Sequence, residues 1–453
     1  MAAEATAQRA ATRSAGSGGH SRKVLTAMLG NGYPAAIAFL TGPILAHSLG
    51  VDGRGMVASA TSPLTLITTV ATFGLPEAVT YTVARNVHLA RHAAARGAAL
   101  LGAAGALATL ALVAAAPVLG EGHPAGERLV LVAALAVVPN LLVGVLRGVA
   151  SARQAWWLVT AERMTSATLR LAVLVPFWLA DRLTPMVATV AIAAMPVAGG
   201  LVYARVLGPA RDVVDDAALA TARANALLGY GLRLWIGSLS GILLSRLDQT
   251  LLTPLASSYQ LGLYVVAVSV SELPLIINTA VRDVSFVTDA HESADERLAT
   301  SARLSTAACT AVGLLLGVSM IWGLPALFGA DFSAAVPVAA VLLVAVVAGT
   351  PGAIAGAGLS ARGRPGARSA SLVIACACNV LLLVLLAPPY GAMGAALATL
   401  VGNLLSSNLN LLFLRRIFGV PAGQFYGLRR SDLAVLRRAA ARWRGSRRTG
   451  AGR

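Results

Sequence analysis

Long apolar segments follow one another along the chain, separated by short polar or basic stretches. A helix needs roughly 20 mostly apolar residues to cross the hydrocarbon core of a bilayer. Segments of this length predict an all-α polytopic membrane protein with about twelve transmembrane helices and no soluble domain of ordinary size. The predicted spans are residues 26–47, 56–75, 97–119, 128–148, 161–180, 185–206, 227–253, 262–281, 303–325, 335–358, 369–388 and 391–414.

The composition supports a bilayer protein. Of the 453 residues, 57% are hydrophobic and 12% are charged, whereas a soluble protein has roughly 25% charged residues. This apolar content excludes a disordered chain, and three cysteines are too few for a disulfide scaffold. The histidines and cysteines show no metal-ligand spacing, so we expect no metal and no other cofactor. The short external loops leave no room for a catalytic domain, so we do not expect an enzyme.

The basic residues predict the topology. With the N-terminus inside, 29 of the 36 Lys and Arg residues lie in the predicted cytoplasmic segments, and only Arg54, Arg128 and Arg182 lie in external loops. Cytoplasmic loops carry such an excess, so both termini are expected in the cytoplasm. The preference for Arg over Lys is typical of a GC-rich bacterial genome but assigns no taxon. We expect a multi-pass protein of the bacterial cytoplasmic membrane. The net charge of +17 then reflects topology, and we expect no nucleic-acid partner.

Short internal matches predict two halves. The sequence Ser-Ala-Arg ends at Arg153 and again at Arg362, each time after a predicted span. Two other short matches have similar offsets, and six plus six helices is a common transporter plan. We expect a disordered leader over 1–25, six-helix bundles over 26–206 and 227–414, a cytoplasmic linker over 207–226 and a basic tail over 415–453. The tail predicts an amphipathic helix from Ser431 that lies on anionic lipid.

Charged residues inside the spans are the candidate site. Each costs about 2.5–3.5 kcal/mol at the bilayer centre on insertion scales, so it is usually functional or paired. Arg163 and Arg170 share one helix face, and guanidinium groups bind phosphate oxygens in pairs. The predicted anion-binding residues are Arg170, Arg246 and Arg233, and the predicted coupling or gating residues are Asp248, Glu272 and Glu77.

Simpler roles stay open for several of these residues. Arg163 could extend to the cytoplasmic interface, and Arg246 could form a structural ion pair between helices. Asp248 lies about 200° round the helix from Arg246. We therefore expect that the two do not pair with each other and that each has a partner elsewhere or lines a wet cavity. Glu77 could be an ordinary interface charge.

Six short motifs, in this order relative to the spans, resemble those of Wzx-type flippases. These proteins belong to the superfamily of multidrug, oligosaccharidyl-lipid and polysaccharide exporters, which also holds MATE drug exporters and lipid II flippases. The motifs are Leu49–Gly55, Phe73–Leu75, Arg246–Gln249, Leu261–Tyr264, Leu327–Phe332 and Tyr390–Ala396.

The resemblance implies a MATE-like, V-shaped pair of six-helix bundles that works by alternating access. The expected substrate is an undecaprenyl-pyrophosphate-linked oligosaccharide for polysaccharide export, and glycan-assembly enzymes are further candidate partners. The alternatives are a cation-coupled MATE exporter of drugs or metabolites, a lipid II flippase and a membrane glycan polymerase. The first predicted span lacks the acidic residue of many MATE antiporters, and lipid II flippases typically have fourteen spans.

Overall fold

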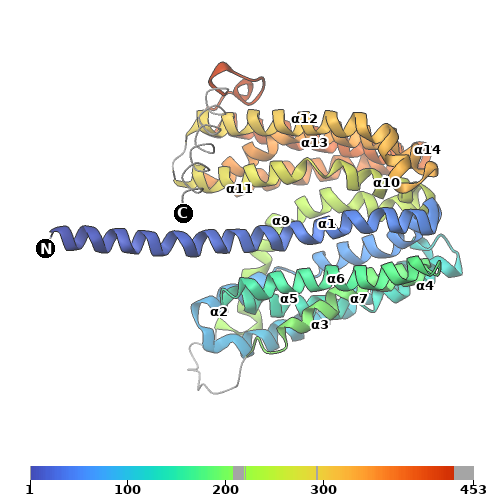
Figure 1. Ribbon diagram of the computed structural model, residues 1–453, viewed down its shortest axis with the longest axis horizontal. Helices are drawn as coiled ribbons and strands as arrows, with labels where there is room; N and C mark the ends of the chain where they lie inside the picture. The colour runs from blue at the N-terminus through green and yellow to red at the C-terminus, as the bar shows by residue number, and fades with distance from the viewer. Residues whose placement is uncertain (1, 208–218, 220, 292–293, 433–453) are drawn as a thin grey trace, which may run out of the picture. The chain divides into compact units, whose positions relative to one another are not determined.

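The computed structural model describes residues 2–207, 219, 221–291 and 294–432, and all regular secondary structure in this part of the chain is helical (Figure 1). The α-helices are α1 (Ala2–Val70), α2 (Leu75–Arg85), α3 (Ala90–Leu119), α4 (Pro124–Ala134), α5 (Val137–Ala152), α6 (Trp156–Leu179), α7 (Pro185–Gly199), α9 (Ala224–Leu255), α10 (Ser258–Ser271), α11 (Leu275–His291), α12 (Asp295–Phe328), α13 (Ala335–Ala361) and α14 (Pro365–Phe418). Short 3₁₀ turns are η1 (Val87–Leu89), η2 (Gly200–Tyr203), η3 (Ala330–Ala334) and η4 (Ala422–Phe425).

Each of the twelve predicted spans coincides largely with helix, which confirms the all-α class. Within the described residues, seven helices are long and apolar enough to cross a membrane, or up to nine if each of two bent pairs is one span. The smaller number has three causes. Helices α1 and α14 each contain two predicted spans, α9 and the α10–α11 pair are bent, and α6 carries three charged residues, Glu162, Arg163 and Arg170.

Single glycines separate the paired spans. Gly50 in α1 has φ 66° and Gly391 in α14 has φ 55°, a region that side chains with a Cβ rarely adopt. Loops were expected over 48–55 and 389–390, but the helix resumes directly after each break. The second helix of α1 ends at Val70, earlier than predicted, and a turn leads into α2.

The structure tests the prediction for the N-terminal segment but not the prediction for the C-terminal tail helix. Helix α1 begins at Ala2, so residues 2–25 are helical where we expected a disordered leader. Alanine recurs through this segment and has the highest helix propensity. The predicted amphipathic tail helix lies almost wholly outside the described residues, which end at Asp432.

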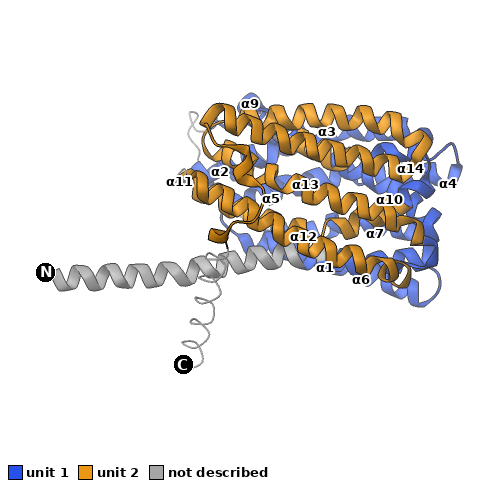
Figure 2. Ribbon diagram, turned by 90° about the horizontal axis from the view of Figure 1, so that it is seen from above, with its two compact units in different colours: residues 1–239, 249–262, 327–331 blue, residues 240–248, 263–326, 332–453 orange. Residues whose placement is uncertain are grey.

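The chain divides into two compact units, coloured in Figure 2. Unit 1 comprises residues 1–239, 249–262 and 327–331, and unit 2 comprises residues 240–248, 263–326 and 332–453. The main boundary falls inside α9, beyond the linker expected over 207–226. Residues 224–239 of α9 therefore belong to unit 1.

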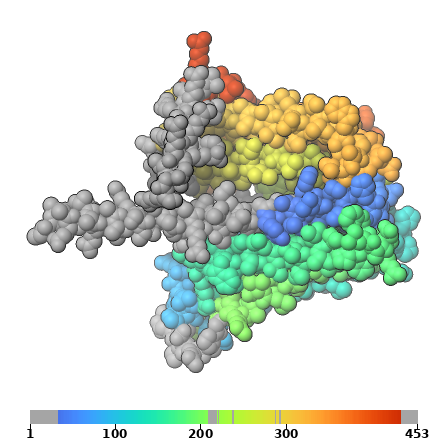
Figure 3. All heavy atoms as spheres, in the orientation of Figure 1, coloured from blue at the N-terminus to red at the C-terminus, as the bar shows by residue number. Residues whose placement is uncertain are grey.

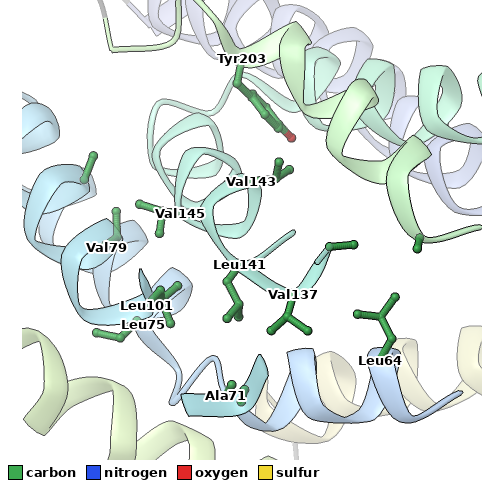
Figure 4. Packing of buried hydrophobic residues seen from close by; sticks show 14 of the residues in the cluster. Leu64, Ala71, Leu75, Val79, Leu101, Val137, Leu141, Val143, Val145 and Tyr203 are labelled. Carbon is green, nitrogen blue, oxygen red and sulfur yellow. The ribbon is translucent and has the colours of Figure 1, made fainter. Parts of the chain in front are cut away.

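Small and branched apolar side chains fill the core of unit 1. Leu75, Leu101 and Leu141, from α2, α3 and α5, are at most 1% exposed and gather in one cluster (Figure 4). Val79 and Val145 extend this cluster along the same helices. These contacts hold α2 as a rigid support for the residues at its end.

The outer face of α12 in unit 2 is strongly apolar. Figure 3 shows this helix along the surface of the molecule, and Leu314, Leu315 and Trp322 are each at least 66% exposed. A soluble protein rarely exposes such a contiguous apolar face, so this face is suited to lipid.

A buried ion pair fixes the last described residues to unit 2. The Arg303 guanidinium donates to both carboxylate oxygens of Asp432, at 2.7 and 2.6 Å, and both side chains are at most 1% exposed. Arg303 is the first residue of the predicted span 303–325, and α12 begins eight residues before it, at Asp295. Arg362 likewise donates to Asp289 and Asp295, at 2.7 Å each for the shortest contacts.

We predict that Asp432→Asn destabilises the protein by about 3 kcal/mol, because the variant leaves the Arg303 charge buried without its partner. The hydrogen bonds from Arg303 also lower the pKa of Asp432 below its ordinary value of 3.8. The pair therefore stabilises at neutral pH, and this contribution is lost as the pH falls through the folded pKa.

Thermal unfolding of the purified protein in detergent measures this loss. The control is Asp283→Asn, because Asp283 is exposed and pairs only with the adjacent Arg282 at 3.3 Å among the contacts described. Such a surface pair contributes about 0–1 kcal/mol. Equal melting temperatures for the two variants would contradict the structural role of Asp432.

Candidate functional site

Helix α6 carries charged side chains into a cavity of unit 1. Arg163 and Arg170 are seven residues apart, and both line a cavity of about 260 Å³ together with Pro34 of α1 and Met195 of α7. The predicted arginine stripe therefore faces one polar space. Glu162 also lines this cavity and is its one acidic residue among those described.

An internal ion pair neutralises Glu162. Its carboxylate is 2% exposed and accepts from Nε and Nη2 of Arg147 at 3.0 and 3.1 Å, while the Tyr203 hydroxyl donates to it at 3.4 Å. The paired geometry is the strong form of the arginine–carboxylate contact. Glu162 is therefore committed to Arg147 and does not pair with Arg170, which faces the same cavity. Sequence analysis placed Arg147 with the cytoplasmic segments and missed this pair.

Arg54 and Arg170 are the least satisfied charged groups in this part of unit 1. The Nε of each is buried and has no hydrogen-bond partner within the described residues. The positive charge of Arg170 acts on Arg54, and α1, which carries Arg54, packs against α6, which carries Arg170. An unsatisfied buried donor costs about 1–3 kcal/mol. The arrangement is therefore suited to an anion that accepts from both groups.

Sequence analysis expected Arg54 in an external loop, and the structure corrects this. Arg54 lies in α1 one turn after Gly50, because the helix resumes directly after the break. From sequence alone, a charged residue flanked by Gly53 and Gly55 is typical of a loop. Only the packing of α1 against α6 brings Arg54 and Arg170 together.

Unit 2 contains a buried carboxylate held by hydroxyl groups. Asp248 of α9 is 4% exposed and accepts a short hydrogen bond from the Tyr264 hydroxyl of α10. The Thr399 hydroxyl of α14 donates to the same oxygen at 3.3 Å. Hydroxyl donors stabilise a carboxylate without neutralising its charge, so the site is suited to a proton or a small cation.

Arg246 and Glu272 form an ion pair in unit 2. Arg246 Nη1 and Glu272 Oε1 are 3.7 Å apart, and the two side chains are 44% and 42% exposed. Arg246 and Asp248 thus have partners outside α9, Glu272 in the turn between α10 and α11 and Tyr264 and Thr399 on α10 and α14, as their spacing along α9 predicts. An ion pair this open is weak, so it can exchange for a ligand at small cost.

Two predicted residues lie away from these groups. Arg233 lines a second cavity of unit 1, which Arg170 does not line. Glu77 is exposed in the first turn of α2. A carboxylate there is stabilised by the helix dipole, which fits the alternative of an ordinary interface charge for Glu77.

Comparison with known proteins identifies the family. The family model described as "Polysaccharide biosynthesis protein" matches residues 21–286, more than half of the chain. The chain belongs to this family. A search of curated proteins gives no match.

Solved structures show the same fold. An inward-facing multidrug resistance MATE family transporter of the MOP superfamily has a TM-score of 0.66 at 15% identity, covering 87% of this chain and 98% of that chain. The lipid II flippase MurJ, in an inward closed conformation, has a TM-score of 0.70 at 10% identity, covering 89% of each chain. A MOP superfamily transporter from Pyrococcus furiosus has a TM-score of 0.55 at 14% identity, covering 90% and 96%.

The chain is thus a member of the polysaccharide biosynthesis family with the fold of the MATE and MurJ structures, and its long apolar helices fit a multi-pass membrane protein. At these identities the solved structures establish the fold, and they do not identify the substrate. The charged groups of this chain are therefore what point to a substrate.

We predict that inorganic pyrophosphate raises the melting temperature of the wild-type protein and does not raise that of Arg170→Gln. Ligand at 100 times its Kd stabilises a protein by about 2.7 kcal/mol, and the variant removes one of the two cations. Differential scanning fluorimetry in detergent at constant ionic strength measures the shift.

The matched control is Arg182→Gln, because Arg182 is exposed in the turn between α6 and α7. This control should keep the full pyrophosphate response. A response that survives in Arg170→Gln would show that Arg170 does not bind the anion.

Proposed function

We propose that this protein flips an undecaprenyl-pyrophosphate-linked oligosaccharide from the cytoplasmic to the outer leaflet for polysaccharide export. The observation that carries the proposal is the pair of half-buried arginines, Arg54 and Arg170, whose buried Nε atoms lack partners within the described residues. Membership of the polysaccharide biosynthesis family supports the same substrate class.

The chemistry of the headgroup fits this pair. A pyrophosphate carries several negative charges and offers many acceptor oxygens, and arginine binds such groups through two parallel hydrogen bonds. A bound headgroup would therefore supply acceptors for the missing hydrogen bonds. The lipid tail needs no polar site and can stay in the bilayer. Flipping makes and breaks no covalent bond, so no catalytic residue is required.

Asp248, Glu272 and Arg246 are our proposed coupling and gating groups. A buried carboxylate held by hydroxyls gains stability when it binds a proton or a cation, and such binding differs between two conformations if the cluster is rearranged. The Arg246–Glu272 pair is open enough to break during such a change. This assignment makes the cluster of unit 2 the site that drives transport, and the arginine pair of unit 1 the site that binds the headgroup.

Loss of the protein should strand the lipid-linked glycan on the cytoplasmic leaflet, and Arg170→Gln should do the same while the protein is still made. Accessibility of the glycan to a membrane-impermeant lectin or hydrolase measures the leaflet distribution in a deletion strain. Complementation by Arg182→Gln is the control and should restore the wild-type distribution.

An unchanged distribution combined with altered efflux of dyes or drugs would contradict the flippase proposal. It would instead favour the cation-coupled MATE exporter, the alternative class with the same fold.

Arg246→Ala should reduce transport at least tenfold at normal expression, because it removes the cation that balances Glu272 next to the Asp248 cluster. The same leaflet assay measures transport, and immunoblotting measures expression. The control is Arg416→Ala, because Arg416 is exposed at the end of α14. Full transport by Arg246→Ala would leave the ion pair with a structural role only.

A further inference from the structure

Unit 1 has a second and larger cavity, at the end of α2 and the start of α9. Its volume is about 580 Å³, within the range of about 300–1,000 Å³ typical of small-molecule sites. It shares none of its described lining residues with the cavity of Arg163 and Arg170. The residues that matter for its chemistry are Tyr81, Arg85, Asn86, Thr221, Tyr230 and Arg233.

Close backbone packing builds this cavity. A Cβ atom on Gly74 would lie 2.3 Å from the carbonyl oxygen of Gly231, so the turn before α2 touches the backbone of α9 directly. This contact brings Tyr81, two turns along α2, against Tyr230. Their rings stack with centroids 4.3 Å apart and planes 15° apart. The stack is a fixed aromatic wall and not a chance surface contact.

Two arginines add positive charge beside this wall. Arg85 donates from Nη1 to the Tyr81 hydroxyl at 2.6 Å, and its guanidinium carbon lies 5.5 Å from the centre of the Tyr81 ring. Arg233 donates from Nε to the carbonyl oxygen of Gly229 at 2.8 Å, which fixes the direction of its side chain. The described lining residues include Arg85 and Arg233 but no Asp or Glu, so this set of residues carries a net positive charge.

The remaining lining groups are neutral and polar. Thr221 supplies a hydroxyl and Asn86 supplies an amide. Aromatic rings, guanidinium groups and neutral hydrogen-bonding groups together fit a hydroxylated ring that bears a carboxylate. The apolar face of such a ring packs on tyrosine, its hydroxyls bond to threonine and asparagine, and its carboxylate pairs with arginine.

We propose that this cavity binds an acidic sugar of the transported glycan. The inference rests on the proposed function, which supplies a glycan as substrate, and it names uronic acids as the part of that glycan recognised by Arg85 and Arg233. By the predicted topology both arginines lie at cytoplasmic span ends, where a newly made glycan is presented. The headgroup and the sugar thus bind to separate sets of arginines in unit 1.

Calorimetric titration of the full-length protein in nanodiscs of zwitterionic lipid tests the proposal. The probes are trigalacturonate and the matched neutral trisaccharide galactotriose, neither of which carries a lipid or a pyrophosphate. We expect the wild type to bind trigalacturonate at least tenfold more tightly than galactotriose. Arg85→Gln and Arg233→Gln should each weaken trigalacturonate binding at least tenfold, because each removes one carboxylate partner.

Two controls separate a loss of binding from misfolding and from the mere loss of one positive charge. Arg85 and Arg233 are exposed, so their replacement should leave the melting temperature unchanged. Arg182→Gln removes an exposed arginine outside the cavity and should keep wild-type affinity. Tyr230→Leu should weaken the binding of both trisaccharides, because it removes one of the two stacked rings.

Equal affinity for the acidic and neutral sugars, or wild-type affinity in Arg85→Gln and Arg233→Gln, would overturn the proposal. Complete loss of trigalacturonate binding in nanodiscs of anionic lipid would also overturn it, and would assign the cavity to a lipid headgroup. The outcome is separable from that of the flippase proposal. Soluble sugars report on this cavity alone, whereas the leaflet assay with Arg170→Gln reports on transport of the lipid-linked substrate.

Discussion

The free-energy cost of a charge away from water is the constraint on which this structure depends. In hydrocarbon every polar group needs a partner within the protein. Arg147 with Glu162 and Arg303 with Asp432 satisfy this rule through paired hydrogen bonds. Such pairs hold elements together and leave no charge for a ligand. The same cost makes an unsatisfied charge a sign of function, because stabilising contacts in the rest of the fold have to offset it.

Unit 1 concentrates its positive charge in two places of different character. Arg54 and Arg170 are half-buried and their buried Nε atoms are unsatisfied within the described residues, so they are suited to a compact anion. Arg85 and Arg233 lie in a wider cavity beside two stacked tyrosines, so they are suited to a larger, hydroxylated ligand. A lipid-linked glycan has one group of each kind. The two sites together would bind both the headgroup and the sugar of one substrate.

Close packing by small residues makes these sites possible. Gly74 and Gly231 let a turn and a helix touch through their backbones, and Gly50 lets α1 change direction without a loop. The cost is a weaker helix at each glycine. In unit 2 the carboxylate of Asp248 is likewise held by hydroxyls from two other helices. Helices joined in this way can shift relative to one another while their side-chain partners change.

The sequence by itself determined the class of the protein. Long apolar segments predicted the helices, since span length is fixed by bilayer thickness, and the spacing of Arg163 and Arg170 predicted a shared face because helical periodicity is local. The same local rule predicted that Arg246 and Asp248 would not pair. Only the tertiary structure decided which charges are satisfied. Glu162 meets Arg147, and the charge of Arg170 acts on Arg54, through packing between helices that no local pattern encodes. The sequence did not predict the cavity beside Tyr81 and Tyr230 for the same reason, because these two tyrosines are nearly 150 positions apart.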